Sequence, residues 1–219
     1  MSDDPLTYTQ VAAEEGLGDW RMMFQTLETR FDTGDFATGL ALVARIGEAA
    51  EELGHHPELD LRFSTLHVRL ISRDVFGVTR RDLDLARRIS ALAAEAGVTA
   101  DPGAVEIVEL ALDTTDHAEV KPFWRTVLGY DDHPLHDREV RDLTGIGPAM
   151  WFQHTDPHAP PVQRFHLDVR VPPEVAGPRI EAALAAGGTL VSDEHAPAFT
   201  VLADAQGNKA CITTGLGRD

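Results

Sequence analysis

The sequence predicts an α+β protein built of two halves. Three observations support this: apolar residues recur at strand and helix spacings along the chain, turn-forming residues interrupt an alanine-rich helix near the middle, and a strand–helix–strand pattern occurs twice in the second half. With 219 residues, 43% of them hydrophobic, the chain is long enough to bury the core that such a fold needs. We therefore expect an ordered chain of two domains.

Local signals place the elements of the first half in order. Asp35 is a candidate N-cap before an amphipathic pattern, and a change of phase at Ser64 and Thr65 predicts a turn between two strands. Thr79 begins the last helical pattern, and Gly97 ends it. The expected elements are a short helix near residues 9–16, a strand around 23–31, a helix over 36–53, a hairpin over 61–70 and a helix over 79–97.

Residues 99–104 are expected to be a linker. They follow the helix stop at Gly97 and contain Asp101, Pro102 and Gly103, which favour turns over regular structure. This placement predicts a first domain over residues 1–98 and a second over residues 105–219.

Two segments of the second half resemble each other. Residues 105–129 and 162–187 each contain an apolar strand pattern, a loop, a helical pattern and a final glycine, and short alternating segments follow each of them. Two βαβββ units are the simplest interpretation, so we expect a paired βαβββ domain.

Charge and cysteine content exclude several classes of protein. The net charge is −17, from 19 basic and 36 acidic residues, and such a surface repels nucleic-acid backbones and anionic membranes. Cys211 is the single cysteine, so no disulfide within the chain is possible. The first residues lack the pattern of a signal peptide, and no apolar run approaches the length of a membrane span. We expect a cytoplasmic protein with no nucleic-acid or membrane partner.

Two adjacent histidines end the second predicted helix. His55 and His56 precede Pro57, which fixes its own φ and stops the helix. Because histidine titrates near neutral pH, the pair could supply both the acid and the base of a dehydration. The pair also fits a structural role, since positive charge is favourable at a helix C-terminus.

The stretch that begins at this pair resembles a known family. Residues 55–86, HHPELDLRFSTLHVRLISRDVFGVTRRDLDLA, resemble the pterin-4a-carbinolamine dehydratases, and the similarity covers residues 5 to about 97. The resemblance implies an antiparallel sheet with helices on one face and a homo-oligomer. It also implies removal of water from 4a-hydroxytetrahydropterin, a small-molecule substrate, to give the quinonoid dihydropterin without a metal or other cofactor.

The same resemblance implies roles for individual residues. His55 and His56 would be the catalytic acid and base, in an order that the sequence leaves open; Pro57, Glu58, Arg73 and Asp82 would bind or position substrate. Asp82 has a second interpretation, because it stands three residues after Thr79 in a capping-box pattern. Arg73 occupies the position of a third family histidine, and arginine cannot accept a proton at neutral pH.

The second half resembles the glyoxalase-like branch of the vicinal oxygen chelate superfamily. The segments that carry the resemblance are FWRTVLGY at 123–130, RFHLDV at 164–169 and DAQGNKACI at 204–212. Members that bind a metal take ligands from the first and last strands of each unit, which here offers Glu109 and His166 as candidate ligands, with Gln153 and Cys211 in approximate register. Cysteine suits zinc better than the hard metals of the family, and whether this half binds a metal stays open.

The leading hypothesis is therefore a dehydratase-like first domain that acts through His55 and His56, with a glyoxalase-like accessory or ligand-binding domain. One alternative is a binding or assembly protein in which Arg73 abolishes turnover. A second alternative is a metal-dependent lyase, isomerase or dioxygenase that acts through the C-terminal domain.

Overall fold

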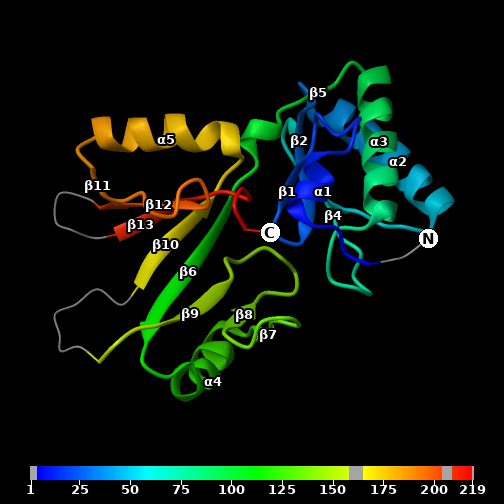
Figure 1. Ribbon diagram of the computed structural model, residues 1–219. Coiled ribbons are helices and arrows are strands. Elements are labelled where there is room, and N and C mark those ends of the chain that lie inside the picture. The colour runs from blue at the N-terminus through cyan, green and yellow to red at the C-terminus, as the bar shows by residue number, and fades with distance from the viewer. Residues whose placement is uncertain (1–3, 158–164, 204–208, 219) are drawn as a thin grey trace. The chain divides into compact units, whose positions relative to one another are not determined.

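The chain forms two compact units. The structure is a computed structural model that describes residues 4–157, 165–203 and 209–218 (Figure 1). The first unit comprises Met1–Val105 together with Gly215–Asp219, and the second comprises Glu106–Thr214. The last five residues therefore group with the first unit, whereas the sequence assigned them to the second.

The first unit is an antiparallel sheet with two long helices. Its helices are α1 (Tyr8–Ala12), α2 (Phe36–Leu53) and α3 (Arg80–Glu95), and its strands are β1 (Arg21–Met23), β2 (Thr26–Asp32), β3 (Glu58–Arg62), β4 (Thr65–Leu70) and β5 (Thr99–Ala100). The strand order is β1-β2-β4-β3, and β5 pairs with β2. The predicted order of elements is confirmed except at the strand expected around residues 23–31, which is a hairpin of the antiparallel strands β1 and β2. Asp35 is the N-cap of α2, as predicted.

Strand alternation decides which face of this sheet meets the helices. Leu27 and Phe31 on β2 and Leu66 and Val68 on β4 join one buried cluster with apolar residues of α2 and α3. Because successive side chains of a strand point to opposite faces, Glu28 and its polar neighbours lie on the other face. The helices therefore cover one face of the sheet, as predicted.

The segment expected as a linker is structured. Thr99 and Ala100 form β5 and pair with Asp32 and Phe31 of β2, and the backbone N–H of Asp101 donates to the carbonyl of Arg30 at 2.7 Å. The 3₁₀ helix Pro102–Ala104 follows. Residues 99–104 therefore complete the first unit, and the linker prediction is wrong at this point.

The second unit contains two βαβββ repeats in one sheet. The first repeat is β6 (Ile107–Thr114), α4 (His117–Leu128), β7 (Asp131–Asp132), β8 (Glu139–Arg141) and β9 (Met150–His154). The second is β10 (Phe165–Arg170), α5 (Pro173–Ala185), β11 (Thr189–Ser192), β12 (Phe199–Ala203) and β13 (Lys209–Thr213). The first strands of the repeats, β6 and β10, pair antiparallel at the middle of an eight-stranded sheet. The predicted repeat is confirmed.

Each helix of the second unit packs on its own half of the sheet. Leu112 and Phe152 are buried in a cluster with side chains of α4, and Val171 and Ile212 in a cluster with side chains of α5. Residues of the opposite strand parity, such as His166, therefore point to the face away from these helices.

No helix among the described residues is long and apolar enough to span a membrane.

Candidate functional site

The C-terminal cap of α2 sets the position of the histidine pair. Gly54 adopts the left-handed conformation, with φ 60° and ψ 30°, which glycine reaches without steric cost. The backbone N–H of His55 then donates to the carbonyl of Ala50 at 3.1 Å, which closes the helix end. The chain turns directly from helix to the first residues of β3, so His55 and His56 occupy that corner.

Asp82 joins His55 to the start of α3. The Oδ1 atom of Asp82 lies 2.7 Å from Nε2 of His55, and its Oδ2 atom accepts from the backbone N–H of Thr79 at 2.7 Å and from the Ser72 hydroxyl at 2.7 Å. Asp82 is completely buried and His55 is also buried. The capping box predicted for Thr79 and Asp82 is present, and the same carboxylate also holds the imidazole.

The two histidines meet different surroundings. The ring of His56 is 64% exposed, and its Nε2 atom lies 3.0 Å from the carboxylate of Glu51 on α2. The ring of His55, in contrast, turns inward to Asp82. Of the two histidines, it is therefore His55 that contacts Asp82, whereas His56 has Glu51 as its acidic partner.

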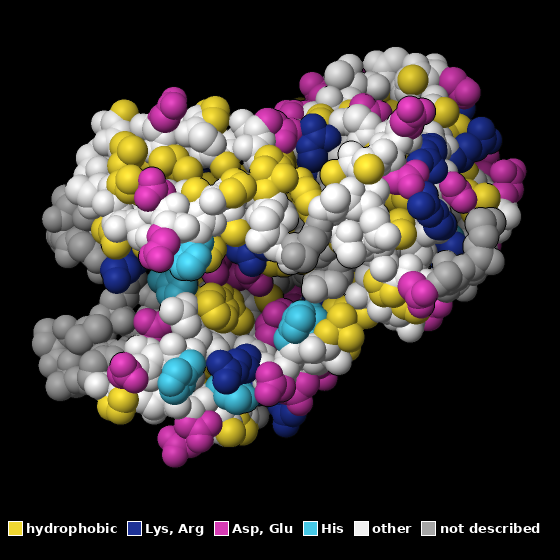
Figure 2. Space-filling view, viewed as in Figure 1, with side chains coloured by type: hydrophobic (Ala, Val, Ile, Leu, Met, Phe, Trp, Pro, Cys, Tyr) yellow, Lys and Arg dark blue, Asp and Glu magenta, His cyan; other side chains and the backbone are white. Residues whose placement is uncertain are grey.

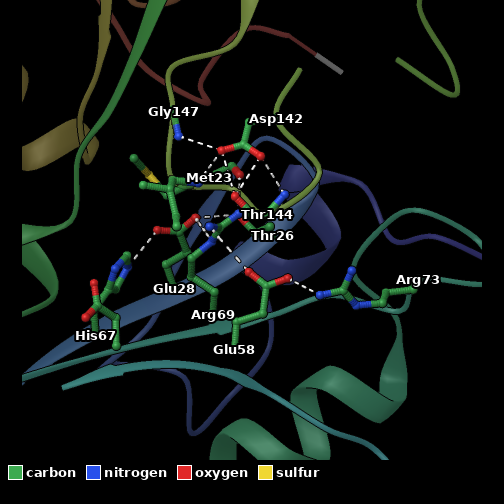
Figure 3. A network of polar contacts seen from close by, with 12 residues as sticks. Met23, Thr26, Glu28, Glu58, His67, Arg69, Arg73, Asp142, Thr144 and Gly147 are labelled. Carbon is green, nitrogen blue, oxygen red and sulfur yellow. Dashed lines mark hydrogen bonds and ion pairs between the residues drawn. The ribbon is translucent and has the colours of Figure 1, made fainter. Parts of the chain in front are cut away.

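Glu58 and Arg73 form an ion pair beside this corner. Glu58, the first residue of β3, pairs with the guanidinium of Arg73, whose side chain is 68% exposed (Figure 3). The second carboxylate oxygen of Glu58 lies 3.3 Å from Arg69 on the adjacent strand β4. Pro57, half-buried, lies between the histidines and this pair.

A buried carboxylate on the helix-free face was missed by the sequence reasoning. Glu28 lies opposite Arg69 in the register of β2 and β4, and its oxygens lie 2.9 Å from Nε2 of His67 and 3.4 Å from Nε of Arg69 (Figure 3). The Thr26 hydroxyl also donates to Glu28, at 2.6 Å. Since Glu58 also faces Arg69, a row of alternating charges crosses β2, β4 and β3. The signal available in the sequence was the alternation along β2, which places Glu28 on the face opposite to Leu27.

The second unit brings a histidine, a carboxylate and a thiol together. One ligand atom each from His166, Asp168 and Cys211 lies within 4.8 Å of the others. On the face shown in Figure 2, histidine side chains lie at several separate places over this unit. Glu109 lies opposite Asp168 in the register of β6 and β10, and thus on the same face. His166 and Cys211 were candidates from the sequence, whereas Asp168 was missed, although its spacing of two residues from His166 places both on one face of β10.

This donor set fits a divalent metal of intermediate softness. Imidazole, carboxylate and thiolate are all zinc ligands, and the hard metals of oxygen-rich sites disfavour thiolate. The residues at this position can therefore hold the metal that the second resemblance implies, provided that it is zinc.

A second titratable pair of this unit lies on β8 and the loop before it. Burial lowers the pKa of His133 to about 4, helped by the nearby charges of His136 and Arg141, and burial raises the pKa of Glu139 to about 7. The Nδ1 atom of His133 accepts from the backbone N–H groups of Leu135 and His136. The pair therefore orders this loop, and no candidate site residue from the sequence belongs to it.

Comparison with known proteins assigns a family to each unit. Residues 4–92 match the family model for pterin 4 alpha carbinolamine dehydratase, and residues 109–213 match that for the glyoxalase-like domain. A protein of Nocardia farcinica is 38% identical over 94 residues, which cover 42% of this chain and 99% of the relative. A protein of Acidobacterium capsulatum is 37% identical over 87 residues, which cover 38% of this chain and 95% of the relative. Both are provisionally named pterin-4-alpha-carbinolamine dehydratases.

A solved structure from Brucella melitensis, titled a transcriptional coactivator/pterin dehydratase, is 28% identical with a TM-score of 0.37, covering 41% of this chain and 99% of that chain. The first family model matches residues within the first unit. The chain belongs to the pterin-4-alpha-carbinolamine dehydratase family through this unit, and it carries a glyoxalase-like domain in its second.

Proposed function

We propose that the first unit dehydrates 4a-hydroxytetrahydropterin to the quinonoid dihydropterin. The observation that carries this proposal is the contact of 2.7 Å between Nε2 of His55 and the buried carboxylate of Asp82. A carboxylate fixed in this way determines the tautomer and the orientation of an imidazole, as acid–base catalysis requires. The names of the relatives support the pterin as substrate.

His55 is the general base in this proposal. With the Nε2 proton donated to Asp82, the Nδ1 atom of a neutral imidazole carries the lone pair. It accepts the proton that leaves the ring nitrogen of the substrate. Asp82 then stabilises the resulting imidazolium, because an opposite charge in hydrogen-bond contact favours the charged ring.

His56 is the general acid. Its ring is exposed, so it can exchange protons with solvent, and its Nε2 atom lies 3.0 Å from the carboxylate of Glu51. Its proton goes to the hydroxyl at C4a, the C–O bond breaks, and water leaves. His56 gives one proton and His55 takes one, so the reaction requires no metal or redox cofactor. The two histidines return to their initial protonation states by proton exchange with solvent.

Glu58 and Arg73 bind the substrate in this scheme. Arg73 cannot replace the proton transfer of a histidine, but its exposed guanidinium offers several donors to a pterin carbonyl. Glu58 holds that guanidinium, and Pro57 fixes the direction in which the chain enters β3.

We also propose that the chain forms a homo-oligomer, which light scattering after size exclusion would measure.

The test is the decay of 4a-hydroxytetrahydropterin with and without the full chain. The proposal predicts acceleration that His55→Ala and His56→Ala each reduce by about 10²-fold or more. His154→Ala, which removes a histidine of β9 in the second unit, is the matched control and should leave the rate unchanged. If the parent protein binds the pterin without accelerating its decay, the binding or assembly alternative replaces this proposal.

A further inference from the structure

We propose that Glu28 is a positioning residue for Arg73, and that it acts through Arg69 and Glu58 to set the affinity of the site for the pterin. This inference rests on the proposed function, in which Arg73 binds the substrate. Glu28 of β2 lies opposite Arg69 of β4, and Arg69 lies opposite Glu58 of β3. Residues directly opposite on adjacent strands point to one face, with Cβ atoms about 4.5–5.5 Å apart. The three side chains therefore form a row of alternating charge on the helix-free face.

The buried end of this row is Glu28, which is 1% exposed. Its Oε1 atom accepts from the Thr26 hydroxyl at 2.6 Å and lies 3.4 Å from Nε of Arg69. Its Oε2 atom lies 2.9 Å from Nε2 of His67. Burying a carboxylate is costly unless hydrogen bonds and an opposite charge compensate, and these partners provide both. Glu28 is therefore a carboxylate fixed in place, on which the rest of the row can be built.

Arg69 transmits this order to Glu58. Its Nε atom faces Glu28, whereas its Nη1 atom lies 3.3 Å from Oε2 of Glu58. Because the guanidinium is planar and rigid, one arginine can meet two carboxylates at defined positions. Arg69 is 19% exposed and Glu58 is 28% exposed, so solvent ions screen this contact less than they screen a pair at the surface. Figure 3 shows Arg69 between Glu28 and Glu58, and Oε1 of Glu58 faces Arg73 on the far side.

Arg73 depends on this row because its own side chain is largely exposed. An ion pair at the surface orders a long side chain weakly, since it costs side-chain entropy and is screened by water and salt. Without the charge of Glu28, Arg69 can turn fully to Glu58 and compete with Arg73 for its oxygens. Arg73 would then occupy more rotamers, and each binding event would have to order it again.

Replacing Glu28 by glutamine should weaken substrate binding and leave the chemical step intact. The amide keeps the size of the side chain but carries no charge. We expect Glu28→Gln to raise KM, and the Kd for a stable 7,8-dihydropterin measured by fluorescence titration of the full chain, by roughly 3- to 10-fold. The value of kcat should not change, because the catalytic histidines have their own carboxylate partners, Asp82 and Glu51. Damage to the fold would instead lower kcat through loss of active protein.

A double variant shows whether Glu28 acts through Arg73. Arg73→Ala should raise the same Kd, and adding Glu28→Gln to Arg73→Ala should change it no further, because the side chain that Glu28 positions is already absent. Thr29→Val is the matched control: it changes the next residue of β2, which is equally buried but on the opposite face, and should bind as the parent does. Additive effects of Glu28→Gln and Arg73→Ala, or a parental Kd in folded Glu28→Gln, would overturn the proposal.

A second variant and the parent protein complete the test. If circular dichroism shows that Glu28→Gln does not fold, Arg69→Lys replaces it, because a single ammonium keeps the charge but cannot span both carboxylates. The same rise in Kd is expected, and parental affinity would overturn the proposal. A parent that binds the dihydropterin without dehydrating its substrate would refute the proposed function, and the Kd values would still decide the role of Glu28. A parent that does not bind the dihydropterin would refute both.

Discussion

Replacing Asp82 by asparagine should separate the two roles of its carboxylate. Oδ2 accepts from the N–H of Thr79 and from the hydroxyl of Ser72, whereas Oδ1 meets Nε2 of His55. The amide oxygen of the variant can retain the bonds from Thr79 and Ser72. Its NH₂ group then faces His55 and forces Nε2 to accept, which moves the imidazole proton to Nδ1.

The expected effects on stability and on rate differ in size. The cap remains, and one hydrogen bond to a charged group becomes a neutral one, so the free energy of unfolding should fall by about 1–2 kcal/mol. The rate should fall by about 10²–10⁴-fold, because the proposed mechanism needs the lone pair of His55 on Nδ1, where the variant places the proton. Denaturant unfolding followed by circular dichroism measures the first quantity, and the decay of 4a-hydroxytetrahydropterin measures the second.

The N-cap of α2 offers a matched control. Asp35 accepts from the backbone N–H of Thr38 at 2.7 Å but contacts no histidine in the structure described. Asp35→Asn should keep the parental rate and lose less than about 1 kcal/mol of stability. A parental rate in Asp82→Asn would show that this carboxylate is a helix cap without a part in catalysis. A stability loss above about 4 kcal/mol would refute the orientation assigned to the amide.

Three further outcomes are expected. Arg73→His restores an imidazole beside Glu58 and should raise the dehydration rate by roughly 10-fold in steady-state assays, and a fall would show that the guanidinium itself is needed. Phe63 is 85% exposed with φ 52°, so Phe63→Asn should raise the unfolding free energy by about 0.5–1 kcal/mol in urea, and no gain would mean an unstrained turn. The pKa of Glu139 is raised from 4.5 to about 7, so the contribution of Glu139 to stability is complete below pH 4.5 and is lost as pH rises through 7. The pKa of His133 is lowered from 6.5 to about 4, so the contribution of His133 is complete above pH 6.5 and is lost as pH falls through 4. The two slopes cancel between pH 4.5 and 6.5, and Glu139→Gln should let second-unit stability rise by about 3 kcal/mol over that range. A flat profile in the variant would contradict the lowered pKa of His133, and the same rise in the parent would contradict the raised pKa of Glu139.

Local signals predicted the elements and the caps because those features depend on neighbouring residues. The capping box of Thr79 and Asp82 is contained within four residues, and the structure has it as predicted. The sequence offered the cap and the pterin site as alternative roles for Asp82. The contact with His55, which is 27 residues away, depends on how α2 and α3 pack, and no local pattern reports that packing.

The linker prediction failed for a related reason. Asp101, Pro102 and Gly103 do form a turn, the 3₁₀ helix, so the local prediction was sound. The two preceding residues nevertheless add a strand to the sheet, because the edge of β2 beside Phe31 and Asp32 is available for pairing. Turn-forming residues therefore mark a change of direction, and pairing with a distant strand decides where a domain ends.

In both units, side chains alternate along each strand, so that apolar residues face the helices and polar residues of the candidate sites face the other side of the sheet. Leu27 and Glu28 are neighbours in the sequence, yet one packs against helices and the other meets His67. Asp168 and Val169 repeat the division in the second unit, with Val169 packed in the core and Asp168 beside His166. A slip of one residue in either register would bury charge against the helices and expose the core, so the core that fixes the register also fixes the polar sites. This coupling explains why sequence reasoning identified single residues of each polar group and missed the partners, Glu28 and Asp168, that the register places beside them.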